Sequence, residues 1–128
     1  VLLGDEEEAD GLWVVGGRVT FVPPRGRRSA DVMTIEGWAV PGLVDLHCHI
    51  GLGPEGPVDL VTAEDQARTD RDAGTLLVRD AGSPSDTRWI DERDDLPRVL
   101  RAGRHLARPK RYLRSYGREL DAVGELPA

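Results

Sequence analysis

Two histidines separated by one residue, His47 and His49, are the side chains of this 128-residue chain best suited to metal chemistry. They follow a mostly apolar run, residues 43–46, that a Pro-Gly pair opens. Successive side chains of a strand point to opposite faces, so we expect both imidazoles on one face and Cys48 on the other. A catalytic zinc takes about three protein ligands and keeps one position for water. The pair therefore predicts half of a metal site, with zinc the expected ion.

A bare His-x-His is more often a pair of structural histidines than a metal site. Here the pair ends an apolar strand and is followed by glycines at positions 51 and 53, which favours metal binding. The strand at 43–47 is followed by a loop at 51–57 and a helix from about Thr62 to residue 73. Thr62 is the expected N-cap, and Gly74 the expected stop.

A second strand is predicted at 75–80 and a third at 98–101. Strand, helix and strand in this order predict a parallel βαβ unit. Residues 1–40 instead predict a small antiparallel β unit with strands at 12–15, 18–22, 32–35 and 38–40. Gly16-Gly17 is the expected turn between the first two. The expected domains are thus 1–40 and 41–128.

Composition narrows the function classes. Lys and Arg number 17 against 23 Asp and Glu, so the net charge is −6, which makes nucleic acid an unlikely partner. The single cysteine forms no internal disulfide, and no apolar stretch has the length of a membrane span. We therefore expect a cytoplasmic protein without a membrane anchor and without a signal peptide.

The segment 41–49, Pro-Gly-Leu-Val-Asp-Leu-His-Cys-His, resembles the first-strand signature of the amidohydrolase superfamily of metal-dependent (β/α)8-barrel hydrolases. Residues 68–82 resemble that family's first helix and second strand. The strands within 12–40 resemble the β-sandwich that precedes the barrel in the imidazolonepropionase-like and prolidase-like branches. The resemblance implies an α/β fold: an N-terminal β-sandwich portion, then the first βαβ units of an incomplete TIM-type barrel.

It also implies an activity, the hydrolysis of amide or cyclic amide C–N bonds other than peptide bonds in a small-molecule substrate by metal-activated water. His47 and His49 match the family's first two metal ligands. The family's bridging lysine, later histidines and catalytic aspartate have no counterpart here. Lys110 and His105 lie in an Arg- and Pro-rich loop. The catalytic base stays unassigned, the rest of the barrel is expected in a longer parent chain, and the isolated chain is expected to be inactive.

Two aspartates are candidates for orienting the histidines. Asp45 shares their predicted face, where its carboxylate accepts a hydrogen bond from an imidazole or, equally, caps a turn. Asp80 ends the second strand, on the side where barrel sites are built. Substrate-binding residues and the number of metal ions are not predicted.

Two alternatives to the hydrolase remain open. In the first, the chain is an inactive truncated remnant. In the second, it is an Arg-rich fragment that binds anions or nucleic acid. The second alternative depends on a basic stretch interleaved with Tyr112 and Tyr116, namely Arg98, Arg101, Arg104, Arg108, Lys110, Arg111, Arg114 and Arg118.

Overall fold

A computed structural model describes residues 2–4, 7–26, 28 and 32–126 of the chain. The protein is mixed α/β, as the sequence predicts, with several strands and one α-helix in the described residues. It divides into two compact units, Val1–Pro41 and Gly42–Ala128. The sequence analysis placed the division between residues 40 and 41.

In its described residues, the first unit contains two antiparallel strand pairs. Trp13 pairs with Thr20 and Val15 with Arg18, so Gly16 and Gly17 alone form the turn between them. Their φ angles of 56° and 74° lie in the left-handed region that a two-residue hairpin turn requires. The predicted hairpin turn is confirmed. The paired strands are β1 (Leu2–Gly4) with β2 (Glu7–Glu8) and β3 (Trp13–Val15) with β4 (Arg18–Thr20).

The predicted strands at 32–35 and 38–40 are wrong, because these residues form no strand. A strand is stabilised by the neighbour it pairs with, and these short apolar runs have no partner strand in the described part of the unit. Trp38 is accordingly 81% exposed. The predicted strand at 18–22 is also shorter than expected, since Val22 N donates to Thr20 Oγ1 in a turn instead of joining the ladder.

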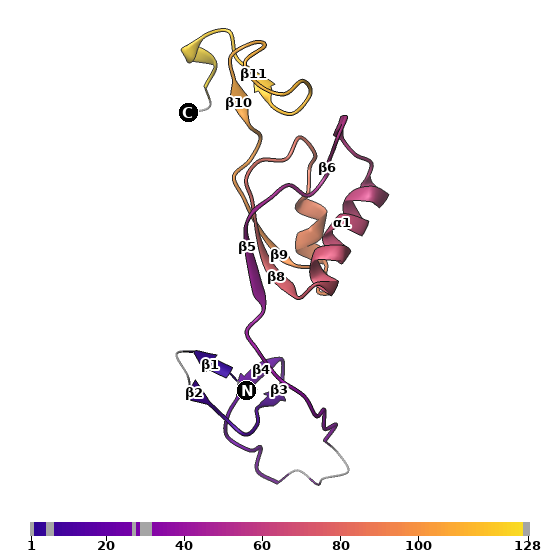
Figure 1. Ribbon diagram of the computed structural model, residues 1–128, viewed down its shortest axis with the longest axis vertical. Helices are drawn as coiled ribbons and strands as arrows, with labels where there is room; N and C mark the ends of the chain where they lie inside the picture. Colours follow the sequence, from indigo (N-terminus) through magenta and orange to yellow (C-terminus); the bar gives the residue numbers. More distant parts are fainter. Residues whose placement is uncertain (1, 5–6, 27, 29–31, 127–128) are drawn as a thin grey trace. The chain divides into compact units, whose positions relative to one another are not determined.

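The second unit is built on a three-stranded parallel sheet in the order β5-β8-β9 (Figure 1). Its strands are β5 (Leu43–Cys48), β8 (Thr75–Asp80) and β9 (Arg98–Arg101). The pairing is parallel throughout, with Val78 opposite Val99 and Asp80 opposite both Cys48 and Arg101. Because the strands run the same way, their carboxyl ends meet at one edge of the sheet.

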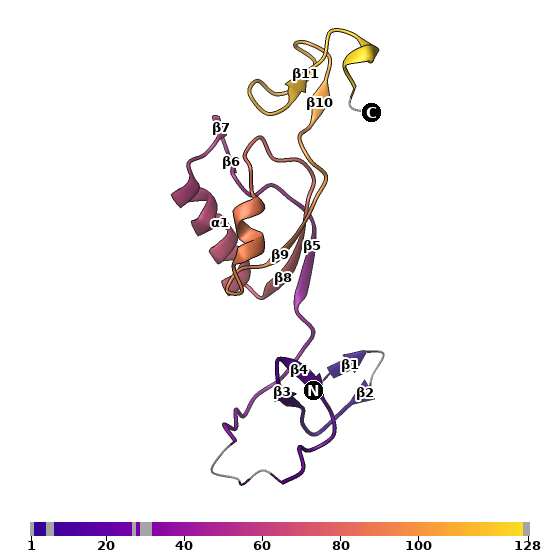
Figure 2. The same ribbon diagram turned by 180° about the vertical axis from the view of Figure 1, so that it is seen from behind.

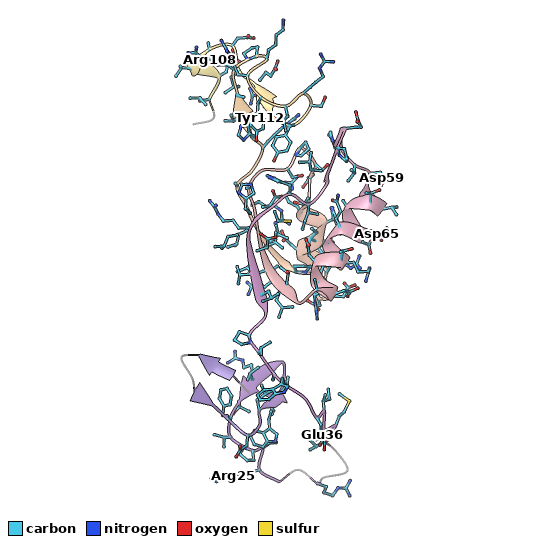
Figure 3. The ribbon with its side chains drawn as sticks, in the orientation of Figure 1. Arg25, Glu36, Asp59, Asp65, Arg108 and Tyr112 are labelled. Carbon is cyan, nitrogen blue, oxygen red and sulfur yellow. The ribbon has the colours of Figure 1, made fainter. Side chains whose placement is uncertain are left out.

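Helix α1 (Leu60–Asp72) connects β5 to β8. Its N-cap is Asp59, whose carboxylate accepts a hydrogen bond of 2.8 Å from Thr62 N, so the expected cap at Thr62 is wrong. Aspartate at this position satisfies one of the amides that the first helical turn leaves without a carbonyl. Asp59 lies at the start of α1 in Figure 3. Gly74 follows the helix with a φ of 95°, as expected of a helix-terminating glycine.

Short elements lie outside the three-stranded sheet, and those within residues 52–57 fall in the segment that the sequence predicts as a loop. They are β6 (Leu52–Gly53), β7 (Gly56–Pro57), the 3-10 helix η2 (Arg88–Glu92), β10 (Leu106–Ala107), β11 (Arg118–Glu119) and the 3-10 helix η3 (Val123–Glu125). β6 pairs with β7 antiparallel, and β10 pairs with β11 parallel.

Both α1 and η2 lie against the same side of the β5-β8-β9 sheet, as Figures 1 and 2 show from opposite directions. The core of the unit lies between them and the sheet. It is a cluster of buried side chains: Ile50, Ala63, Ala67, Val78, Ile90 and Leu96. Among the described residues, no helix combines the length and the apolar character that crossing a membrane requires.

The position of the core predicts that two alanine substitutions change the free energy of unfolding by clearly different amounts. Ile90→Ala removes a side chain that is 2% exposed, so the free energy of unfolding should fall by about 2–5 kcal/mol. Val123→Ala truncates a side chain that is 79% exposed and should change it by less than about 0.5 kcal/mol. Urea unfolding of both variants measures the difference, and equal midpoints would contradict this description of the core.

Candidate metal site

The two histidine rings lie together at the carboxyl end of β5. Their centroids are 5.0 Å apart and their planes are nearly perpendicular, at 85°. His47 is exposed, whereas His49 is partly buried. Two imidazoles brought together from one strand end can supply two nitrogen ligands to one metal ion.

A backbone carbonyl faces one of the two nitrogens of the His49 ring. Nδ1 of His49 lies 2.9 Å from the carbonyl oxygen of Gly82, two residues beyond the end of β8. A carbonyl only accepts hydrogen bonds, so Nδ1 carries the proton and Nε2 carries the lone pair. Histidines that bind metals commonly donate their other ring nitrogen in this way.

Asp80 acts on His49 through Gly82. Its side chain is buried, and its Oδ1 accepts a hydrogen bond of 2.9 Å from Gly82 N. Burial raises the pKa of Asp80, while this hydrogen bond and the nearby His49 and Arg101 oppose that rise. Gly82 has a φ of 125°, and a Cβ there would lie 3.2 Å from the Gly103 carbonyl oxygen, so a glycine is needed for the carbonyl to face the ring.

Asp45 contacts the backbone of the histidine segment instead of a ring. Its Oδ1 accepts a hydrogen bond of 2.9 Å from His47 N. The pairing of β5 with β8 is irregular between Asp45 and Cys48, so this amide is satisfied by a side chain where the ladder is interrupted. Of the two roles expected for Asp45, the local cap is the one that this contact matches.

Cys48 lies on the side of β5 that faces α1. Its Sγ is 3.6 Å from Asp70 Oδ2, and it packs against the core. Burial, with the charges of Asp70 and Asp45, raises the pKa of the Cys48 thiol to about 12. The thiol stays protonated at neutral pH, as in an inert structural cysteine. Cys48 and α1 residues 62–70 border a hollow of about 420 Å³, which His49 also lines.

Tyr116 is a contact of His49 that the sequence analysis missed. Its hydroxyl oxygen lies 2.7 Å from Nδ1 and 3.1 Å from Nε2 of His49. The two rings meet edge to face, with centroids 5.4 Å apart. Burial raises the pKa of Tyr116, with smaller contributions from Tyr112 and Asp80, so the hydroxyl keeps its proton. The residue was noticed only as part of a basic stretch, and nothing in its local pattern links it to a histidine 67 positions away.

His105 and Lys110, already set aside as ligands on sequence grounds, have other contacts. The His105 ring stacks on Tyr112 at 3.8 Å between centroids. The backbone amide of Lys110 donates to Glu119 Oε1. Within the part of the chain that the structure describes, no three His, Cys, Asp or Glu side chains are grouped as a metal site. The donor set therefore fits two ligands of a zinc site, His47 near the end of β5 and His49 directly after the strand.

The basic stretch between 98 and 118 is mostly exposed. Arg101 is the member with a structural role. Its guanidinium donates to both carboxylate oxygens of Asp91 at 3.0 Å and to the hydroxyl and carbonyl of Thr87. These hydrogen bonds join β9 to η2 and to the residue that precedes η2. Figure 3 marks two residues of the stretch that follows β9, Arg108 and Tyr112, on the segment between β9 and β11.

Comparison with known proteins gives relatives without an assigned activity. The chain is 54% identical over 123 residues to uncharacterized proteins of Mycobacterium tuberculosis and Mycobacterium bovis. The matched residues make up 96% of this chain but only 32% of each relative, so the chain spans about a third of their length. No protein-family model matches the chain, and no solved structure matches it.

The contact between Asp80 and Gly82 predicts a graded effect of two substitutions. Asp80→Ala leaves the Gly82 amide without its acceptor in a buried place and should lower the free energy of unfolding by about 1–3 kcal/mol. Asp80→Asn keeps an oxygen at this position and should cost clearly less. Chemical denaturation of both variants measures the difference, and an alanine variant as stable as the wild type would contradict the role of Asp80.

Proposed function

We propose that this chain is part of a metal-dependent amidohydrolase that hydrolyses non-peptide C–N bonds, in amides or cyclic amides, of a small-molecule substrate. His47 and His49 are its first two metal ligands, with zinc the expected ion. The observation that carries the proposal is the pair of imidazoles, 5.0 Å between centroids, at the carboxyl end of a parallel strand. In (β/α)8 barrels the catalytic residues occupy this end of the strands.

The arrangement around the pair supports the proposal. The neighbouring strand β8 ends in buried Asp80, and the turn that follows it provides the carbonyl that binds His49 Nδ1. A histidine whose second nitrogen donates to the backbone is held in one orientation and one tautomer. Sheet order β5-β8-β9, with a helix between the first two strands, is also the order in which a (β/α)8 barrel begins.

The length of the relatives also supports the proposal. Because 123 matched residues are 32% of each relative, the relatives are about 380 residues long. A (β/α)8 barrel takes about 250 residues, so such a chain has room for a complete barrel and a small β domain. We therefore propose that the remaining metal ligands and the general base belong to a longer parent chain, with the cytoplasm as the expected compartment.

In this proposal the chain's own residues bind the metal ion and orient the ring of one of its ligands. His47 and His49 hold the metal through nitrogen, and Gly82, held in turn by Asp80, fixes the ring of His49. Zinc bound at such a site makes water a nucleophile at neutral pH, because it lowers the pKa of that water to about 7. The thiol of Cys48 takes no part, since it faces α1 and stays protonated.

The test is metal content and hydrolysis in the full-length protein that contains this chain. Purified protein is assayed for bound zinc and for hydrolysis of a panel of linear and cyclic amides, before and after chelation and zinc addition. His47→Asn and His49→Asn should each lower zinc affinity by about 100-fold or more, since loss of a partner that only orients a ligand already costs about 10- to 100-fold. Hydrolysis should fall with it.

His105→Asn is the matched control. It removes the third histidine of the chain, whose ring stacks on Tyr112, and should leave zinc content unchanged. Zinc content and amide hydrolysis that survive in both the His47 and His49 variants would refute the proposal. Absence of zinc-dependent hydrolysis in the wild-type protein would instead favour the inactive remnant.

A further inference from the structure

The segment that directly follows His49, residues 50–52, begins in a buried place. Ile50 is 1% exposed, and Gly51 is buried as well. Peptide groups in such a place need hydrogen-bond partners, because an unpaired buried amide or carbonyl costs free energy. Here several of the partners are side chains, and they come from two other parts of the second unit, helix α1 and the loop after β8.

Gln66 of α1 binds this segment through both ends of its amide group. Its Oε1 accepts a hydrogen bond of 2.8 Å from Gly51 N, and its Nε2 donates one of 2.9 Å to the Leu52 carbonyl. A glutamine side chain carries one acceptor and one donor group, so it satisfies two neighbouring peptide groups at once. A glutamate at this position would lack the donor, and an apolar residue would lack both groups.

Two serines of the loop after β8 bind the carbonyls of the same segment. Ser83 Oγ donates to the Ile50 carbonyl at 2.7 Å, and Ser85 Oγ donates to the Gly51 carbonyl at 2.9 Å. Gly51 has a φ of 87°, and a Cβ there would lie 2.8 Å from Ser85 Cβ, so this approach requires glycine. The backbone beyond His49 is therefore tied both to α1 and to the loop after β8.

His49 depends on this support because the strand before it is less regularly paired. The pairing of β5 with β8 is irregular between Asp45 and Cys48, directly before the second histidine. The Gly82 carbonyl binds the ring of His49, but a ring is oriented only when the backbone that carries it is fixed too. Residues 50–52 provide this fixed backbone on the other side of His49.

We propose that Gln66 is a positioning residue for the candidate metal site. Through Gly51 N and the Leu52 carbonyl it fixes the backbone next to His49, and so holds the imidazole of His49 beside that of His47. The consequence for metal binding rests on the proposed function. The order of residues 50–52 and the position of the ring do not, because they are properties of the protein without metal.

The experiment compares full-length protein with its Gln66→Met variant, both dialysed against a chelator. Methionine has a similar length but no donor and only a weak acceptor. Hydrogen exchange of the Gly51 amide should become about two- to twelvefold faster, as loss of one hydrogen bond implies. The ring-proton NMR signals of His49, recorded above pH 8 and identified by their loss in His49→Asn, should shift. They report its position because the ring meets that of His47 edge to face.

Zinc affinity is measured on the same proteins and should fall by about tenfold in Gln66→Met, the lower end of the range for residues that orient a metal ligand. Asp65→Asn is the matched control, since it changes an exposed neighbour on the same helix and should leave all three readouts unchanged. Asp59→Ala weakens α1 at its N-cap and should lower stability without changing zinc affinity.

Unchanged Gly51 exchange or unchanged His49 ring signals in a folded Gln66→Met protein would overturn the proposal. So would an equal loss of zinc affinity in Asp59→Ala, because the effect would then be one of general stability. If the wild-type protein binds no zinc while both metal-free readouts change as expected, the proposed function fails and the positioning role of Gln66 stands.

Discussion

The hydrogen bond between His49 and the Gly82 carbonyl is the interaction on which the candidate site depends. It joins the carboxyl ends of β5 and β8, where Ala81 N also donates to the Cys48 carbonyl at 3.0 Å. Two features of the β8 end support this hydrogen bond. Asp80 holds the Gly82 amide, and the positive φ of Gly82 turns its carbonyl toward the ring. A parallel pair of strands supplies this arrangement because both strands end at the same edge of the sheet.

Within the described residues of the second unit, Gly42–Ala128, the sheet that contains this hydrogen bond is covered by helices on one side only. Helices α1 and η2 bury Val78 completely, yet Val44 and Leu100, on neighbouring strands, stay 51% and 59% exposed. Parallel sheets are found almost only with both faces covered, and apolar side chains of this size are usually buried. This imbalance agrees with the proposal that further barrel strands and their helices belong to the same enzyme.

Local patterns in the sequence predicted the elements whose formation depends on residues close by in the chain. The apolar run before His47, the glycine after α1 and the Gly16-Gly17 turn each have a short-range cause, and the structure has them in the expected places. The N-cap was misassigned because Asp59 and Thr62 are both good caps, three residues apart, and only the hydrogen bond distinguishes them. The strands expected at 32–35 and 38–40 failed because β propensity acts only where a partner strand is available.

The contacts of His49 could not be predicted in this way, because its partners lie 33 and 67 residues further along the chain. Closing a long loop costs only slightly more entropy than closing a short one, so folding places few limits on where in the chain such a partner comes from. Sequence periodicity reports the strand that carries a ligand, whereas the groups that orient the ligand are determined by tertiary packing. Gly82 illustrates the same limit: the sequence analysis assigned it no role, and only the fold directs its carbonyl to His49. A candidate metal ligand is thus visible in a sequence before the residues that orient its side chain.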